Sequence, residues 1–267
     1  MRKSLIIVLC LAAVAVGLGR RYVPSHSLIG PSTVLHFKLY NGLMIAGNVF
    51  DYSFNGTTGE LFDGDTPDTL INTYPGFHFD GTEDNIYTNA TYQTTFDGSF
   101  SMMAWVKPDD GRAGDYQVII GAVHDTTPLE DVVHVSIQTT GKVRFTYETN
   151  DDAAYAEESV ASFADGQGEW THIAVVATED ISLRIYVDGA IQTLGGAPAD
   201  GDATGQTFAD FVTDGDINVG GLNSDTTHDG YHSWFAGLIS DARIFNIALN
   251  AIEIKNIYNT TRWRFQQ

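Results

Sequence analysis

The stretch Glu169–Thr193 constrains the fold most, because it contains a strand with a strict two-residue period followed by a tight turn. One set of alternate side chains is Ile181, Leu183, Ile185 and Val187, and the other is Ser182, Arg184, Tyr186 and Asp188. This period indicates a β-strand with one face in a hydrophobic core and the other outside it. Asp188-Gly189 then favours a type I′ hairpin turn, because both central residues of that turn need a positive φ.

Similar segments occur along most of the chain. In Lys142–Glu148 the alternate residues Val143, Phe145 and Tyr147 are predicted to face inward, and Leu35, Phe37 and Leu39 do the same in a first strand. Phe100–Val106 is apolar on both faces, which is typical of a central strand covered on both sides. Gly-, Asp- and Asn-rich turns separate these segments, so we expect two antiparallel sheets packed face to face. Only Asn250–Tyr258 has helical spacing, with Asn250 placed to cap it.

Several short motifs stand in a characteristic order around the Trp170–Gly189 hairpin. They are Leu35–Leu39, Asp51–Gly56 (DYSFNG), Phe77–Gly81 (FHFDG), Ser99–Pro108 (SFSMMAWVKP), Asp216–Gly220 (DINVG) and Phe235–Leu249 (FAGLISDARIFNIAL). This order resembles the concanavalin A-like lectin/glucanase superfamily, and within it the laminin-G-like jelly-roll domain. The resemblance implies an all-β, two-sheet antiparallel jelly-roll sandwich over residues 33–259, with a short C-terminal helix.

Charge limits the partners that the domain can have. The chain has 34 acidic and 14 basic residues, and its formal net charge is −20. Such a surface repels nucleic acid and anionic membranes, so we expect no nucleic-acid partner. The single cysteine, Cys10, lies in the N-terminal apolar run, so the predicted domain has no disulfide. A domain of this size does not require one, because its core is large enough.

The N-terminal residues 1–21 have the pattern of an export signal. Arg2 and Lys3 precede an apolar run from Leu5 to Leu18, which is shorter than the roughly 20 residues of a membrane-spanning helix. Arg20-Arg21 stands where a cleavage site prefers small neutral residues, so a cleaved signal peptide and a retained apolar anchor both stay open. Residues 22–32 are predicted to be a linker and residues 260–267 a C-terminal tail. Export predicts a secreted or cell-surface location.

A calcium site is one candidate for function. Asp51 and Asn55 bracket a short turn, and hard cations need several oxygen ligands on such a turn. The resemblance implies that this turn helps hold a structural calcium ion together with an acidic residue of a late strand, here Asp241. The alternative is an Asx-turn without a metal.

A second candidate is a ligand site built from loop residues. Loops at one end of a β-sandwich often carry binding sites, and carbohydrate sites pair aromatic platforms with hydrogen-bonding side chains. The residues that fit this description are Tyr87, Asp225, His228, Asp229, Tyr231 and Trp234. The alternative is that they belong to ordinary polar turns.

Catalysis is not expected from this sequence. The glucanases that the chain resembles carry their carboxylates on one strand, as Glu-x-Asp-x-Glu or a similar run, and no such run occurs here. Adjacent pairs such as Glu157-Glu158 would point to opposite faces of a strand. We therefore expect an exported, non-catalytic, lectin-like binding or adhesion domain that recognises glycan or protein at a cell surface. The alternative is a self-assembling structural subunit of an extracellular filament or virion.

Overall fold

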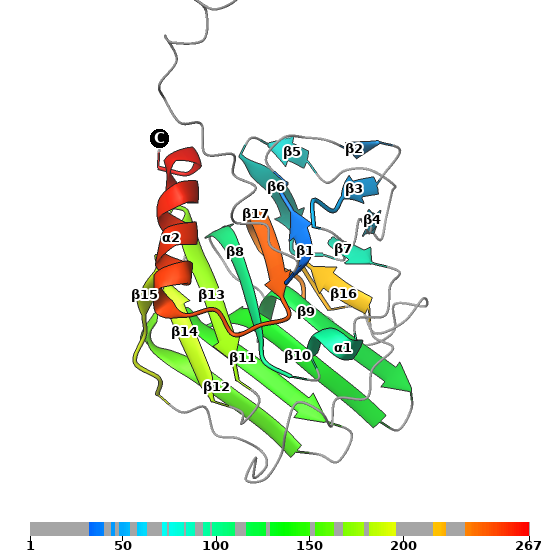
Figure 1. Ribbon diagram of the computed structural model, residues 1–267. Helices are drawn as coiled ribbons and strands as arrows, with labels where there is room; N and C mark the ends of the chain where they lie inside the picture. Colours follow the sequence, from blue (N-terminus) through cyan, green and yellow to red (C-terminus); the bar gives the residue numbers. More distant parts are fainter. Residues whose placement is uncertain are drawn as a thin grey trace, which may run out of the picture. The chain divides into compact units, whose positions relative to one another are not determined.

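The computed structural model describes most of the predicted domain. The described residues are 32–39, 44–45, 48–53, 58–62, 71–73, 75–82, 84–88, 93–96, 98–109, 116–126, 129–149, 153–162, 168–178, 182–195, 216–222 and 233–266. They form two antiparallel β-sheets and a C-terminal helix, so the predicted jelly-roll sandwich is confirmed (Figure 1). The predicted export segment lies outside the described residues. None of the helices in the described part has the length and apolar character of a membrane span.

Sheet A has the strand order β15-β14-β13-β8-β17-β6-β5, and β1 also pairs with β17. Its strands are β1 (Thr33–Phe37), β5 (Ile71–Thr73), β6 (Gly76–Asp80), β8 (Phe100–Pro108), β13 (Thr171–Ala177), β14 (Leu183–Val187), β15 (Ala190–Ile191) and β17 (Ala236–Phe245). β8 lies between β13 and β17 and is buried on both faces, as the apolar character of Phe100–Val106 predicts.

Sheet B has the strand order β12-β11-β10-β9-β16-β7-β4-β3-β2. Its strands are β2 (Met44–Ile45), β3 (Asn48–Phe50), β4 (Thr58–Phe62), β7 (Asn85–Thr88), β9 (Tyr116–Thr126), β10 (Leu129–Gln138), β11 (Lys142–Thr149), β12 (Ala153–Ser162) and β16 (Asp216–Val219). The short helix α1 (Gln93–Phe96) lies between β7 and β8 in the chain.

Alternate side chains of the two sheets meet in one hydrophobic core. Phe37 on β1 and Ile185 on β14 contribute from sheet A, and Val143 and Phe145 on β11 contribute from sheet B. Burial of each large apolar side chain contributes about 1.5–3 kcal/mol before the entropy of ordering is subtracted. The inward faces predicted for the first strand and for Lys142–Glu148 are therefore confirmed.

Helix α2 (Ala251–Thr261) packs on the outer face of sheet A, the face turned away from sheet B (Figure 1). The side chain of Asn250 accepts hydrogen bonds from the backbone N–H groups of Ile252 and Glu253, and Glu253 accepts one from the backbone of Asn250. This capping box fixes the first turn and confirms the predicted helix start. The helix continues past the predicted boundary at residue 259, into the 3₁₀ turn η3 (Arg262–Arg264).

Trp105 on β8 attaches α2 and the chain end to the sheet. Its buried indole ring stacks on Tyr258 and Phe265, with ring centroids 5.6 Å and 4.5 Å away. Its Nε1 donates a 2.9 Å hydrogen bond to Thr261 Oγ1, which satisfies the indole N–H inside the contact. Phe265, from the predicted tail, thus belongs to the packed domain.

The hairpin between β14 and β15 has the predicted turn. Asp188 and Gly189 both have positive φ, 52° and 69°, as a two-residue type I′ turn requires. Tyr186 differs from the simple in-and-out expectation, because it is almost completely buried on the face opposite Leu183 and Ile185. The reason is that helix α2 covers this outer face of sheet A. Its residues Tyr258 and Thr261 contact Trp105, which lies on the same face.

Candidate functional site

Asp241 lies at an irregular point in β17. It has a positive φ of 50°, and the register against β8 shifts between Ser240 and Arg243, which marks a β-bulge. On its other edge, β17 pairs with β6 up to Ile239 and with β1 from Ala242 onward. The bulge therefore sits where β17 exchanges one neighbouring strand for another, and it directs the Asp241 side chain into a cluster of charged residues.

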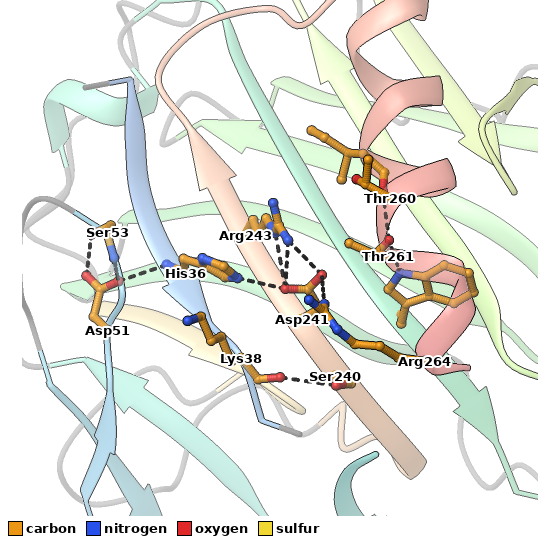
Figure 2. A network of polar contacts seen from close by, with 12 residues as sticks. His36, Lys38, Asp51, Ser53, Ser240, Asp241, Arg243, Thr260, Thr261 and Arg264 are labelled. Carbon is orange, nitrogen blue, oxygen red and sulfur yellow. Dashed lines mark hydrogen bonds and ion pairs between the residues drawn. The ribbon is translucent and has the colours of Figure 1, made fainter. Parts of the chain in front are cut away.

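Arg243 is the main partner of Asp241 (Figure 2). Its Nη2 lies 2.9 Å from Oδ1 and 2.8 Å from Oδ2 of the carboxylate, and its Nε lies 3.2 Å from Oδ1. Burial would raise the pKa of Asp241, but the charge of Arg243 and the hydrogen bond from His36 outweigh it and hold that pKa well below its ordinary value. Asp241 is therefore ionised at all physiological pH values.

His36 on β1 contributes a third group to this network. Its Nε2 lies 2.7 Å from Asp241 Oδ1, while its Nδ1 is buried and has no hydrogen-bond partner. Burial, with the charge of Arg243 added, lowers the pKa of His36 from 6.5 to about 4, despite the opposing effect of Asp241. The imidazole is therefore neutral at pH 7 and donates its Nε2–H to the carboxylate.

Two further cations lie beside Asp241. Arg264, from η3, places Nη1 3.8 Å from Asp241 Oδ2, so the network joins β1, β17 and the C-terminal end of the domain. Lys38 places its ammonium 3.7 Å from the centroid of the Tyr52 ring. Burial, together with the charges of Arg264 and Arg243, lowers the pKa of Lys38. None of these partners of Asp241 was predicted from the sequence. The one signal for them in the sequence is His36, a histidine placed between the core residues Leu35 and Phe37 of the first strand.

Asp51 is the first residue of the predicted Asp51–Gly56 turn, of which the structure describes residues 51–53. Its Oδ1 accepts hydrogen bonds from the backbone N–H of His36 at 2.8 Å and of Ser53 at 2.7 Å. The Ser53 hydroxyl also lies 2.6 Å from Asp51 Oδ2. These contacts are those of an Asx-turn that ties the loop after β3 to β1.

The three predicted calcium ligands are not all described. Asn55 lies outside the described residues, and Figure 2 shows His36 between Asp51 and Asp241. A cation beside Asp241 would share the carboxylate with the Arg243 guanidinium. Among the described side chains, no group of three His, Cys, Asp or Glu residues could hold a metal ion. The calcium site stays a prediction.

Tyr87, a predicted ligand-binding residue, lies on β7 in sheet B. Its side chain shares the outer face of sheet B, the face turned away from sheet A, with Glu60 and Asn218, which pair with it on β4 and β16. The Tyr87 hydroxyl donates a 2.6 Å hydrogen bond to Glu60 Oε2. Asn85, two residues earlier, is buried and donates to Asn218 Oδ1 at 3.3 Å.

Trp234, a second predicted ligand-binding residue, is half-buried and packs over Gly221. A Cβ atom at residue 221 would come within 2.3 Å of Trp234 Cε3, so only glycine allows this approach. The same position is 3.5 Å from Asn85 Cβ, so the structure brings Trp234 close to the strand that carries Tyr87. The other predicted ligand-binding residues, Asp225, His228, Asp229 and Tyr231, lie outside the described residues.

Comparison with known proteins identifies the family. A family model of the laminin G type, described as the concanavalin A-like lectin/glucanases superfamily, matches residues 80–255. The chain belongs to the concanavalin A-like lectin/glucanase superfamily. The match includes β8, β13, β14 and β17 of sheet A and the whole hairpin around Asp188-Gly189, so the resemblance based on sequence motifs is confirmed. No curated protein sequence matches the chain.

Solved structures show the same superfamily fold at low sequence identity. The binding domain of botulinum neurotoxin DC, in complex with rat synaptotagmin II, is 13% identical and has a TM-score of 0.60; the match covers 86% of this chain and 51% of that one. Botulinum neurotoxin type C, which enters cells through interaction with two ganglioside molecules, is 13% identical with a TM-score of 0.59, covering 88% and 53%. A Trypanosoma rangeli sialidase is 14% identical with a TM-score of 0.62, covering 90% and 34%. The chain thus spans about half of the toxin chains and a third of the sialidase.

Proposed function

We propose that this protein is an exported, non-catalytic binding domain that recognises glycan or protein at a cell surface. The observation that carries the proposal is the match to a lectin-type family model over residues 80–255. Similar folds serve as the binding domains of neurotoxins that engage synaptotagmin II or gangliosides. Because fold alone does not determine function, the site must supply the rest of the argument.

The described polar clusters support binding rather than catalysis. The most strongly perturbed carboxylate, Asp241, is buried and held by Arg243 and His36, so it is not placed to transfer a proton or attack a substrate. No described strand carries two carboxylates two residues apart, the spacing that would put them on one face. Tyr87 on β7 and Trp234, in the segment before β17, supply an amphipathic ring each, and aromatic rings of this kind favour recognition surfaces.

Intact cells from the native source provide the test. Labelled full-length protein is added to untreated cells, to cells treated with glycosidases and to cells treated with protease. Saturable binding that glycosidase removes supports glycan recognition, and binding that only protease removes supports a surface protein. Absence of saturable binding contradicts the proposal. Export is tested separately by finding the protein outside the cell and by mass spectrometry of its first residue.

A further inference from the structure

Helix α2 and the turn η3 form an outer layer on sheet A, and one stripe of their side chains is turned away from the domain (Figure 1). The residues on the opposite side are buried; they are Ile254, Ile257, Tyr258, Thr261 and Phe265. The exposed stripe, here called the outward stripe, consists of Ile252, Asn256, Asn259 and Trp263. Because these residues follow one another at spacings of four, three and four, they lie in one row along the helix.

The outward stripe contains no charged side chain, although the exposed face of a surface helix usually carries charged and polar residues. The charged residues around it are engaged with the domain. Glu253 accepts a hydrogen bond in the capping box, and Lys255 Nζ donates to the backbone carbonyl oxygen of Asp188 at 3.1 Å. The Arg262 guanidinium lies 5.8 Å from the centroid of the Tyr258 ring. Depletion of charge is typical of the centre of a protein–protein contact.

Both ends of the outward stripe are apolar and open to solvent. Ile252 is 73% exposed, the highest value among the large apolar side chains of the described residues, and Trp263 is 60% exposed. The Arg264 guanidinium lies 5.2 Å from the centroid of the Trp263 ring and helps to hold the ring in place. Single exposed apolar residues are normal on a protein surface. Here two of them share one stripe, and Trp is enriched among the residues that dominate binding energy.

The outward stripe has the same order from either end. It reads apolar, amide, amide, apolar, and its spacings of four, three and four are also symmetric. If two such helices pack antiparallel about a two-fold axis, Ile252 lies level with Trp263 of the partner subunit, and Asn256 lies level with Asn259 of the partner subunit. A symmetric dimer requires a self-complementary patch of this kind, because each copy contributes the same surface to the contact.

We propose that the outward stripe pairs with the outward stripe of a second copy of this chain and forms an antiparallel, two-fold symmetric dimer. This inference goes beyond the proposed function and does not depend on which ligand the domain binds. Removal of Ile252 and Trp263 from water at both ends of the contact drives association. At the centre, Asn256 and Asn259 each offer amide N–H donors and a carbonyl acceptor. Such a central amide pair fixes the register, as a buried Asn does in a coiled coil.

Sedimentation of the full-length protein over a range of micromolar concentrations tests the dimer. One helix pair is a small interface, so we expect a monomer–dimer equilibrium rather than a permanent dimer. Trp263→Ala and Ile252→Ala should each raise the dissociation constant about thirtyfold or more, because each lost side chain occurs twice in a symmetric dimer. Val160→Ala, which truncates a 57% exposed apolar residue on sheet B, is the matched control and should leave the dissociation constant unchanged.

Folding of these variants is checked where the wild type is monomeric. At such concentrations all three should have the melting temperature of the wild type, because the substituted side chains are exposed. A change in the dissociation constant then reports the contact between copies and not a loss of structure.

Cysteine cross-linking tests the register. Chains with Ile252→Cys and chains with Trp263→Cys, both in a Cys10→Ser background, are mixed and mildly oxidised. The proposed dimer places these two positions side by side, so the mixed disulfide should dominate. Two copies of the same variant should not cross-link, because their cysteines would be about 16 Å apart along the helix. A disulfide needs Cα atoms within about 7 Å.

Four results would overturn the dimer. The protein could stay monomeric at every concentration, or form an open series of larger species, which indicates a head-to-tail contact. A dimer that survives both Trp263→Ala and Ile252→Ala has its interface elsewhere. Disulfides that join two copies of the same variant, in place of the mixed product, mean a parallel or shifted pairing. None of these results bears on the proposed function, which the cell-binding experiment decides separately.

Discussion

Arg243 lies two residues after Asp241 on the same strand and donates hydrogen bonds to both of its carboxylate oxygens. Arg243 Nη2 is 2.9 Å from Asp241 Oδ1 and 2.8 Å from Asp241 Oδ2. In a regular strand, the side chains of residues i and i+2 point to the same face, and the two residues are roughly 7 Å apart. The bulge at Asp241 changes this geometry. The side chains of both residues are at most 5% exposed, so the pair forms away from water. The attraction between the two charges therefore contributes less to stability than the free-energy cost of leaving either charge buried without its partner.

We expect Asp241→Ala to be among the most destabilising single substitutions in the domain. It leaves Arg243 buried without its carboxylate, and loss of one partner of a buried ion pair typically costs about 3–5 kcal/mol. Asp109→Ala, which removes the carboxylate of the half-exposed His78–Asp109 pair, is the matched control and should change stability by less than about 1 kcal/mol. Urea unfolding of the two variants measures both values. Equal stabilities would contradict a structural role for the network.

The two aromatic residues of the C-terminal segment should differ sharply in importance. Phe265 stacks on Trp105 and is 5% exposed, whereas Trp263 is 60% exposed. Phe265→Ala should lower the free energy of unfolding by about 3–5 kcal/mol, as for other buried aromatic truncations. Trp263→Ala should change it by about 0.5 kcal/mol or less. Chemical denaturation compares them; a larger loss for Trp263 would show that the chain end packs differently.

Much of the fold could be predicted because its signals are local. The alternation in β11, the inward face of β14, the Asp188-Gly189 turn and the Asn250 cap each depend on residues close together in the chain, and each was confirmed. The partners of Asp241 could not be predicted in this way. His36 reaches Asp241 only because β1 pairs with the second half of β17, and that register depends on contacts between the two ends of the domain. The burial of Tyr186 under α2 could not be predicted for the same reason. It depends on helix α2 packing on the outer face of sheet A, a contact between segments far apart in the chain.

Acid should weaken the domain through its buried histidines. The pKa of His172 is lowered to about 3, first by burial, and its ring packs edge-on against Trp105 at 5.3 Å. Because this value lies below the unfolded pKa near 6.5, the unfolded chain binds the extra proton between pH 6.5 and about 3. The stabilisation is complete above pH 6.5 and declines as the pH falls through that window, by about 2 kcal/mol at pH 5.

His172→Phe keeps an aromatic ring at this position but cannot titrate. Between pH 7 and pH 5, its free energy of unfolding should therefore fall by about 2 kcal/mol less than that of the wild type. Urea titrations at the two pH values measure the difference. Parallel losses in wild type and variant would mean that His172 is protonated equally in the folded and unfolded chains.

Calcium, if it binds at Asp51, Asn55 and Asp241, should raise the melting temperature, because a ligand that binds only the folded state stabilises it by mass action. At a calcium concentration about 100 times the dissociation constant, the gain is about 2.7 kcal/mol. Asp51→Asn separates this effect from the turn, since an amide oxygen can still accept the hydrogen bonds from His36 and Ser53 that Asp51 Oδ1 accepts. We expect the wild type to melt higher in calcium than in chelator, and Asp51→Asn to melt equally in both. Identical midpoints for the wild type would assign Asp51 to the turn alone and leave Asp241 to Arg243.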